Sequence, residues 1–261
     1  MAGFVQRMTK VVQPGKSAID GVVEAARATW APSSFLARLQ RTTLDRLLDL
    51  GEVQTYSAGE RIITEGDGDS AVHLLLTSYA KVTGRRLDGG EALLAIRVGG
   101  DLVGEFAAID EGDKQLRMAT VTACGRDPVV ALGVEADPFH ETLAAQDLPA
   151  QRHLMAAVVE KTRAASRQRV DNATPNTRIR LARALLELAR TCGDGGLGHS
   201  VRIRAPLTQL ELGTLVGVSK ATAERALREL REARLVDTSE KYPIIRDVKE
   251  LAKLALVDAI I

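Results

Sequence analysis

The segment from residue 207 to residue 230 constrains the fold more than any other part of the chain, because helix starts, a turn and buried positions follow at fixed spacing. Thr208 followed by Glu211 is a capping box, a pattern that opens a helix. Gly217 provides a tight turn, and Ser219 then caps a second helix. The segment therefore predicts two short helices joined by a turn of about three residues.

The second of these helices has two different faces. The inward face is small and apolar, and it consists of Ala223, Ala226, Leu227 and Leu230. The outward face is polar and basic. A capped helix of this kind, placed after a short helix and a turn, has the geometry of a recognition helix that enters the major groove of DNA. The alternative interpretation is a helical hairpin that serves only for packing.

The predicted DNA-contacting residues lie at the starts of the two helices and along the outward face of the second. Arginine reads guanine through two hydrogen bonds, whereas lysine and threonine hold phosphate. The next segment, Leu235 to Arg246, predicts a hairpin that forms a wing. The full predicted set is Thr208, Gln209, Ser219, Lys220, Ala221, Thr222, Glu224, Arg225 and Arg228.

The sequence pattern of the rest of the chain changes twice. Between Gly51 and Asp137, short apolar runs alternate with glycine and aspartate clusters, which predicts an all-β sandwich or barrel. Glycine is then absent from Glu135 to Cys192, which predicts a long helical region with a break at Pro175. A length of 261 residues suits two domains, each with its own core.

The charge is unevenly distributed along the chain. The net charge is +1, but residues 33–150 hold 11 lysines and arginines against 19 acidic residues, whereas residues 176–235 hold 11 against 6. A basic C-terminal third on an acidic body favours contact of that end with a polyanion.

Composition also excludes several classes of protein. No apolar run approaches the roughly 20 residues that span a bilayer, and the N-terminus lacks the apolar stretch of a secretory signal. The two cysteines, Cys124 and Cys192, form neither a disulfide framework nor a CxxC metal site. No nucleophile–base pair, paired carboxylates or P-loop stands out. We therefore expect a cytoplasmic protein without a membrane segment, a catalytic site or a metal site.

Three motifs precede the helix-turn-helix in a fixed order: Tyr56 to Asp67, Gly100 to Phe106, and Arg117 to Val121. In this order they resemble the Crp-Fnr superfamily of bacterial transcriptional regulators, over about residues 35–248. The resemblance implies an α+β fold, with an N-terminal cyclic-nucleotide-binding-type β-roll, a long central dimerisation helix and a C-terminal winged helix-turn-helix. It also implies a homodimer that reads a palindromic operator in double-stranded DNA, with RNA polymerase as a further partner.

On this resemblance the chain divides into an N-terminal extension (1–32), an effector-sensing β-roll (33–146), the central helix (147–172) and the DNA-binding domain (173–261). The sequence assigns no role to the extension or to the last helix, which begins near Lys249. The candidate dimer seam of the central helix is only fairly apolar. Its stripe consists of Leu154, Val158, Lys161, Ala165 and Gln168.

In the members that bind a cyclic nucleotide, a Gly-Glu pair and a later Arg-Ser-Ala hold the cyclic phosphate and the ribose. A guanidinium pairs well with a phosphodiester anion in a partly buried site. The resemblance assigns this role to Gly104, Glu105, Phe106, Arg117, Met118 and Ala119, with Ser166 of the central helix as the purine contact.

Departures from that pattern leave the identity and the existence of an effector open. Met118 replaces the serine, and the loop before Arg117 is longer than usual and carries several acidic residues. Cyclic AMP or cyclic GMP is one candidate effector. The alternative is a ligand-independent regulator, in which Glu105 and Arg117 form a structural ion pair in an empty roll, or a regulator gated by a different small effector.

Other sensing chemistries and the operator can be judged from single residues. The two cysteines lie in separate domains, and His73 sits in an apolar strand run, so neither an iron–sulfur cluster nor a haem is favoured. Ala221 stands where members that read the operator of the cyclic-AMP receptor carry glutamate. We therefore expect a different operator, with Arg225 retained and Glu224 as a replacement reader.

Overall fold

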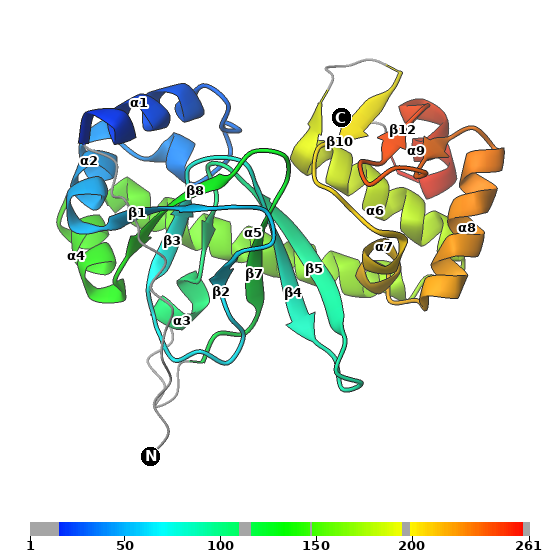
Figure 1. The fold of residues 1–261 in the computed structure, drawn as a ribbon, viewed down its shortest axis with the longest axis horizontal. Coiled ribbons are helices and arrows are strands. Elements are labelled where there is room, and N and C mark those ends of the chain that lie inside the picture. The colour runs from blue at the N-terminus through cyan, green and yellow to red at the C-terminus, as the bar shows by residue number, and fades with distance from the viewer. Residues whose placement is uncertain (1–15, 110–115, 147, 195–198, 258–261) are drawn as a thin grey trace.

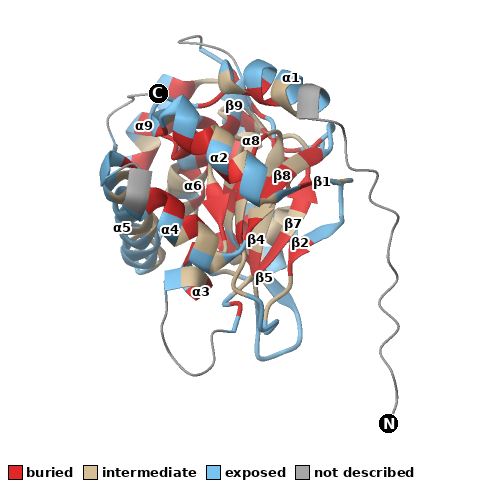
Figure 2. Ribbon diagram, turned by 90° about the vertical axis from the view of Figure 1, so that its left-hand side faces the viewer, coloured by how far each residue is buried: buried red, intermediate tan, exposed pale blue. Residues whose placement is uncertain are grey.

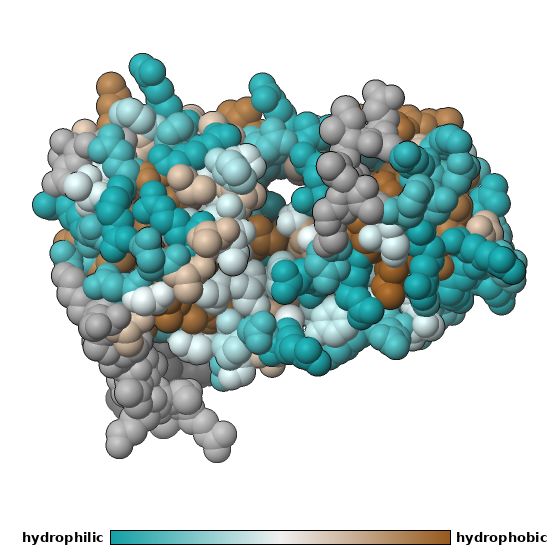
Figure 3. Space-filling view, turned by 90° about the horizontal axis from the view of Figure 1, so that it is seen from above, coloured by the Kyte–Doolittle hydropathy of each residue, from teal (hydrophilic) through white to brown (hydrophobic). Residues whose placement is uncertain are grey.

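The computed structural model describes residues 16–109, 116–146, 148–194 and 199–257. Two domains lie side by side, and one long helix, α5 (Leu148–Asn172), connects them (Figure 1). Seen from above, hydrophilic side chains cover most of the surface, and hydrophobic ones form small separate patches (Figure 3). The predicted α+β architecture is confirmed. No helix in the described part of the chain is long and apolar enough to cross a membrane.

The N-terminal domain is a roll of two four-stranded antiparallel sheets. Apolar residues of both sheets, among them Ile63, Leu75 and Val129, form one buried cluster. The sheets therefore pack face to face, as the short alternating runs of the sequence predict. The first sheet contains β1 (Glu52–Tyr56), β8 (Val129–Val134), β3 (Val72–Leu75) and β6 (Leu102–Val103), and the second contains β2 (Arg61–Ile63), β7 (Thr120–Cys124), β4 (Tyr79–Arg85) and β5 (Glu91–Val98).

Helices close one end of the roll, where their buried residues join those of the first sheet (Figure 1). Val23 of the N-terminal extension belongs to this cluster, so the extension contributes to the core. Trp30 is also buried, and its indole N–H donates a hydrogen bond to the carbonyl of Leu76 at 2.9 Å. These helices are α1 (Lys16–Arg27), the short 3-10 helix η1 (Leu36–Arg38), α2 (Arg41–Leu50) and α4 (Ala136–Gln146).

Helix α5 has one face on the protein and the other in solvent (Figure 2). Leu154 is buried, Lys161 donates to the carbonyl of Leu102 at 2.6 Å, and Gln168 donates to the carbonyl of Leu215 at 2.6 Å. The stripe predicted as the dimer seam therefore contacts this chain's own domains, and its polar members have intrachain partners. The exposed apolar residues of α5 lie elsewhere, and they are Leu148, Met155, Val159 and Val170.

In the described part of the C-terminal domain, four helices pack against a small antiparallel sheet. The last helix is amphipathic, and its Leu251 and Ala255 are buried in the core that it shares with α6. Arg183 of α6 donates to the carbonyl of Ala255 at 2.8 Å, which satisfies one of the free carbonyls at that helix end. The elements are α6 (Thr177–Cys192), β9 (Gly193–Asp194), β10 (Val201–Ile203), α7 (Gln209–Leu215), α8 (Lys220–Glu232), β11 (Val236–Asp237), β12 (Ile244–Ile245) and α9 (Val248–Ala255).

Candidate DNA-binding and effector sites

Local capping contacts fix the two helices of the DNA-binding motif. The Thr208 hydroxyl accepts a hydrogen bond from the backbone N–H of Glu211 at 3.1 Å, and the Glu211 carboxylate accepts one from the backbone N–H of Thr208 at 2.7 Å. The Ser219 hydroxyl accepts one from the backbone N–H of Thr222 at 3.3 Å. The capping box and the serine cap predicted from the sequence are both confirmed.

The turn between α7 and α8 depends on two glycines. Gly217 has a φ of +67°, in the left-handed region that glycine adopts without steric cost. A Cβ on Gly213 would lie 3.1 Å from the Cβ of Ala223, so a missing side chain lets the two helices approach closely. Sequence reasoning identified Gly217 but missed Gly213. The sequence did contain a signal for Gly213, because a glycine inside a predicted helix is unfavourable unless close packing requires it.

The face of α8 that points away from the core is open to solvent. All four residues predicted for the inward face are buried. Lys220 and Glu224 form an i,i+4 ion pair at 3.7 Å along the outward face. Of the predicted DNA-contacting residues, Gln209 and Thr222 are partly buried, and the exposed ones are Thr208, Ser219, Lys220, Ala221, Glu224, Arg225 and Arg228. The exposed basic side chains can therefore reach phosphate and base edges.

A short hairpin of β11 and β12 stands beside α8, as predicted for the wing. Arg231 of α8 donates to the hydroxyl of Thr238 at 2.7 Å, which joins the helix to the hairpin. Asp237 accepts hydrogen bonds from Ser239 and pairs with Arg246 at 2.7 Å. These partners, Ser239 first, lower the pKa of Asp237 to about 2, so the pair stays charged at neutral pH.

Three residues predicted to hold a cyclic nucleotide, Gly104, Glu105 and Arg117, form the candidate effector clamp. Gly104 and Glu105 lie where β6 meets the short helix α3 (Glu105–Ile109). Gly104 has a φ of +87°, and a Cβ there would lie 2.5 Å from Nη1 of Arg117, so the position requires glycine. Arg117 is only 3% exposed. It donates to the carbonyls of Gly104 at 3.1 Å and Ala71 at 2.6 Å, and it forms a bidentate ion pair with Asp69.

Glu105 has a different partner. Its carboxylate is 2% exposed and accepts a hydrogen bond from the ammonium of Lys161 on α5 at 2.6 Å. Burial lowers the pKa of Lys161, and the negative charge of Glu105 opposes that shift. Because Glu105 pairs with Lys161 and Arg117 pairs with Asp69, the ion pair between Glu105 and Arg117 that the sequence suggested does not form.

The remaining predicted ligand-contacting residues are more exposed than Glu105 and Arg117. Phe106 and Met118 are exposed, Met118 to 77%, and Ala119 is partly buried. Ser166 is exposed on α5, five residues beyond the Lys161 that reaches Glu105. Among the residues that the structure describes, no side-chain hydrogen bond joins any of these four to Glu105 or Arg117.

The cysteines and histidines form no reactive cluster. No group of three metal-ligating side chains occurs among the described residues. Cys124 and Cys192 are buried free thiols, and burial raises their pKa values to about 12 and about 11. Thiols with such pKa values are unreactive at neutral pH.

Both halves of the chain match known domain families in the order that the geometry implies. The cyclic nucleotide-binding domain matches residues 53–146, and the Crp-like helix-turn-helix domain matches residues 179–254. The chain is a member of the Crp-Fnr superfamily of transcriptional regulators.

Full-length relatives of this Crp-Fnr chain align over most of its length. The CRP-like cAMP-activated global transcriptional regulator of Mycobacterium tuberculosis is 27% identical over 201 residues, which cover 77% of this chain and 86% of that protein. The cyclic AMP receptor protein of Thermus thermophilus is 29% identical over 215 residues, which cover 81% and 92%. A CRP-family regulator from Thermus thermophilus has the same fold, with a TM-score of 0.63, 21% identity, and coverage of 79% of this chain and 99% of that chain.

The clamp of this Crp-Fnr protein has residue types that suit a cyclic nucleotide, but its charged side chains are already paired with other residues of the chain. Gly104 and Arg117 provide the small cradle and the guanidinium that suit a phosphodiester anion. Both charged groups of the clamp, however, already have protein partners, Asp69 and Lys161. Sequence reasoning gave neither partner a role at the clamp. Asp69 lies in a glycine and aspartate cluster interpreted as a turn, and Lys161 was visible only as a polar break in the apolar stripe of α5.

Proposed function

We propose that this Crp-Fnr regulator acts in the cytoplasm as a homodimer and reads a palindromic operator with the α8 helix of each subunit. The observation that carries the proposal is the exposed basic face of α8, on a helix that its caps and a tight turn hold in place. In a dimer, two such helices reach major grooves about 34 Å apart. The relative from Mycobacterium tuberculosis is named a global transcriptional regulator, which supports a role without catalysis. Contact with RNA polymerase stays a prediction of the resemblance.

The two basic residues at the start and middle of α8 have different proposed roles. Arg225 lies on the exposed face and is the base reader, because a guanidinium can form two hydrogen bonds with guanine. Lys220 lies at the first turn, beside Glu224, and is a phosphate contact. The methyl side chain of Ala221 cannot accept a hydrogen bond. The base opposite it is therefore read by a neighbouring residue or not read at all.

DNA binding tests these roles. An operator is selected from random duplexes with the wild type, and affinities for it and for random DNA are measured by fluorescence anisotropy at several salt concentrations. Arg225→Ala is expected to cost about 1–3 kcal/mol on the operator and little on random DNA. Lys220→Ala is expected to weaken both and to reduce the salt slope by about 1. Arg126→Ala, which removes an exposed arginine from the roll, is the control. Equal losses on both DNAs for the two α8 variants would contradict the assignment.

A cyclic nucleotide is the proposed effector, because the relatives in both species are named for cyclic AMP and the clamp keeps Gly104, Glu105 and Arg117. A ligand there would lie beside α5 and favour one arrangement of the two DNA-binding domains over others. A second candidate is a ligand-independent regulator. The Glu105–Lys161 pair favours it, since this contact neutralises a buried carboxylate without a ligand.

A further inference from the structure

The guanidinium of Arg117 is almost fully engaged by the protein itself. It donates to both carboxylate oxygens of Asp69 through Nε and Nη2, to the carbonyl of Ala71 through Nη2, and to the carbonyl of Gly104 through Nη1. An arginine side chain has five N–H groups, so these four hydrogen bonds leave one. The bidentate contact with Asp69 has the geometry with which arginine binds a phosphate.

The backbone around Asp69 is hydrogen-bonded to the segment that carries Arg117, which precedes β7. The N–H of Gly66 donates to the carbonyl of Arg117 at 2.9 Å, and the N–H of Arg117 donates to the carbonyl of Asp67 at 2.9 Å. Gly66 has a φ of +88°, which lets the chain turn sharply before Asp69. The turn therefore delivers the Asp69 carboxylate to Arg117.

The two partners of this ion pair differ in exposure. The Arg117 side chain is 2% exposed, whereas the Asp69 side chain is 54% exposed. Asp69 can therefore rotate into solvent without unpacking the core. Arg117 would stay in place, because the carbonyls of Ala71 and Gly104 still orient its guanidinium.

We propose that Asp69 is a built-in competitor for the anionic group of an effector, and that it sets the affinity of the roll for phosphodiester ligands such as cyclic nucleotides. This inference rests on the proposed function, because it concerns the effector of the same regulator. A buried guanidinium needs a counter-charge, and Asp69 supplies it when no ligand is bound. A cyclic nucleotide that reaches Arg117 must displace Asp69 or share the guanidinium with a second anion, and like charges at that distance repel.

Titration calorimetry with cyclic AMP and with cyclic GMP tests the proposal on the full-length protein. Asp69→Asn keeps the size of the side chain and one acceptor for Arg117 but removes the charge. We expect its Kd for at least one of the two nucleotides to be about tenfold lower than that of the wild type, or lower still. In the double variant Asp69→Asn, Arg117→Gln the gain should disappear, since the freed guanidinium is its cause.

Asp67→Asn is the matched control. It removes an acidic side chain from the same turn, and Asp67 meets Arg117 only through its backbone. Its Kd should stay within about twofold of the wild type. Equal gains in both single variants would overturn the proposal, because a general loss of negative charge would then explain them. An unchanged Kd in Asp69→Asn would also overturn it, as would the absence of nucleotide binding in every variant. If Asp69→Asn does not fold, Asp69→Ser replaces it in the titration, because serine also removes the charge.

Operator binding by the same preparations separates this inference from the proposed function. If all variants bind the selected operator and Asp69→Asn gains no nucleotide affinity, the role of Asp69 falls and the DNA-binding function stands. If the wild type binds no operator in preference to random DNA, the proposed function fails whatever the nucleotide affinities are.

Discussion

His73 lies beside the Arg117–Asp69 pair, on β3 and opposite Gly133 of β8. Burial and the positive charge of Arg117 lower the pKa of His73 to about 4, and the charge of Asp69 opposes this only in part. In the unfolded chain the imidazole has its ordinary pKa near 6.5. Between these values the unfolded state binds the extra proton, so the free energy of unfolding decreases as the pH falls from about 6.5 to about 4. The loss is at most about 3 kcal/mol.

Urea denaturation across this pH range tests the role of His73. We expect His73→Gln to lack the part of the acid destabilisation that begins near pH 6.5. Asp69 titrates in a different window, because its pKa lies below its ordinary value. Partial burial alone would raise that pKa, but the hydrogen bonds and charge of Arg117 outweigh the effect. Parallel stability curves for the wild type and His73→Gln would contradict the assignment.

Sequence reasoning succeeded for contacts within one turn of the chain and failed for contacts across the roll. The partners Thr208 and Glu211 are three residues apart, and helical geometry alone brings them together. Asp69 and Arg117 are 48 residues apart, and Glu105 and Lys161 are 56 apart. Which strand lies beside which is a property of the packed roll, so no local pattern could pair these residues.

At the scale of elements, the sequence predicted α5 and a dimer stripe along it, and two polar residues of that stripe have partners within the chain. A 3.6-residue period identifies stripes on a helix, and it does not say which stripe packs against the same chain. The stripe through Lys161 and Gln168 is used within the chain. Met155 and Val159 lie four residues apart on the same side of α5, and both are exposed. This second stripe is the better candidate for the contact between two subunits.

The dimer contact is tested by changing that exposed stripe. Met155→Glu, Val159→Glu places two like charges where two α5 helices would meet, so we expect the protein to become monomeric and to lose most of its operator affinity. Analytical ultracentrifugation measures the change in mass. Leu94→Glu makes the same kind of change at an exposed apolar residue of β5 and should leave the mass unchanged. A dimeric double variant would place the interface on another surface.

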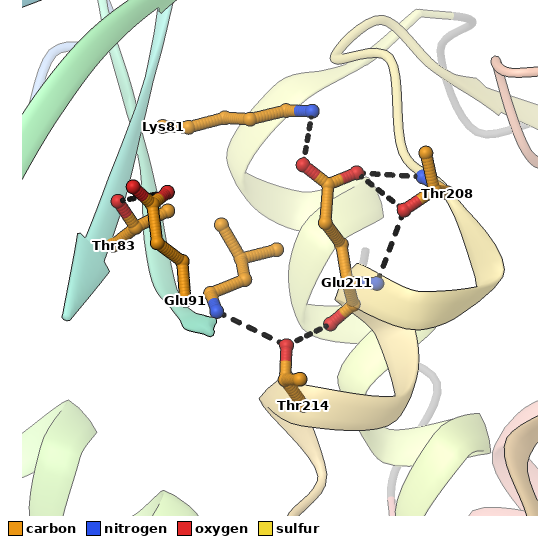
Figure 4. Close-up of polar contacts among 7 residues, drawn as sticks. Lys81, Thr83, Glu91, Thr208, Glu211 and Thr214 are labelled. Atoms are coloured by element: carbon orange, nitrogen blue, oxygen red, sulfur yellow. Dashed lines mark hydrogen bonds and ion pairs between the residues drawn. The ribbon is translucent and has the colours of Figure 1, made fainter. Parts of the chain in front are cut away.

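At the scale of the whole molecule, the β4–β5 hairpin of the roll docks onto α7 (Figure 4). Lys81 of β4 pairs with Glu211 at 2.5 Å, and the backbone N–H of Leu93 donates to the hydroxyl of Thr214 at 3.1 Å. Leu93 and Ile96 of β5 belong to the buried cluster that forms the core of the DNA-binding domain. Glu211 therefore has two tasks, since one carboxylate oxygen caps α7 and the other holds the roll.

This shared carboxylate makes the coupling between the domains measurable. Lys81→Met keeps the capping box and removes the cation that faces Glu211, whose side chain is only 23% exposed. We expect docking to weaken by about 1–3 kcal/mol, because the carboxylate stays partly buried without its partner. In calorimetry the ratio of van't Hoff to calorimetric enthalpy should fall below that of the wild type, as the two domains begin to unfold separately. Lys253→Met removes a lysine whose partner, Glu250, is 53% exposed on α9, and should leave the ratio unchanged. If Lys81→Met also leaves it unchanged, the apolar contacts of Leu93 and Ile96 hold the domains together without the ion pair.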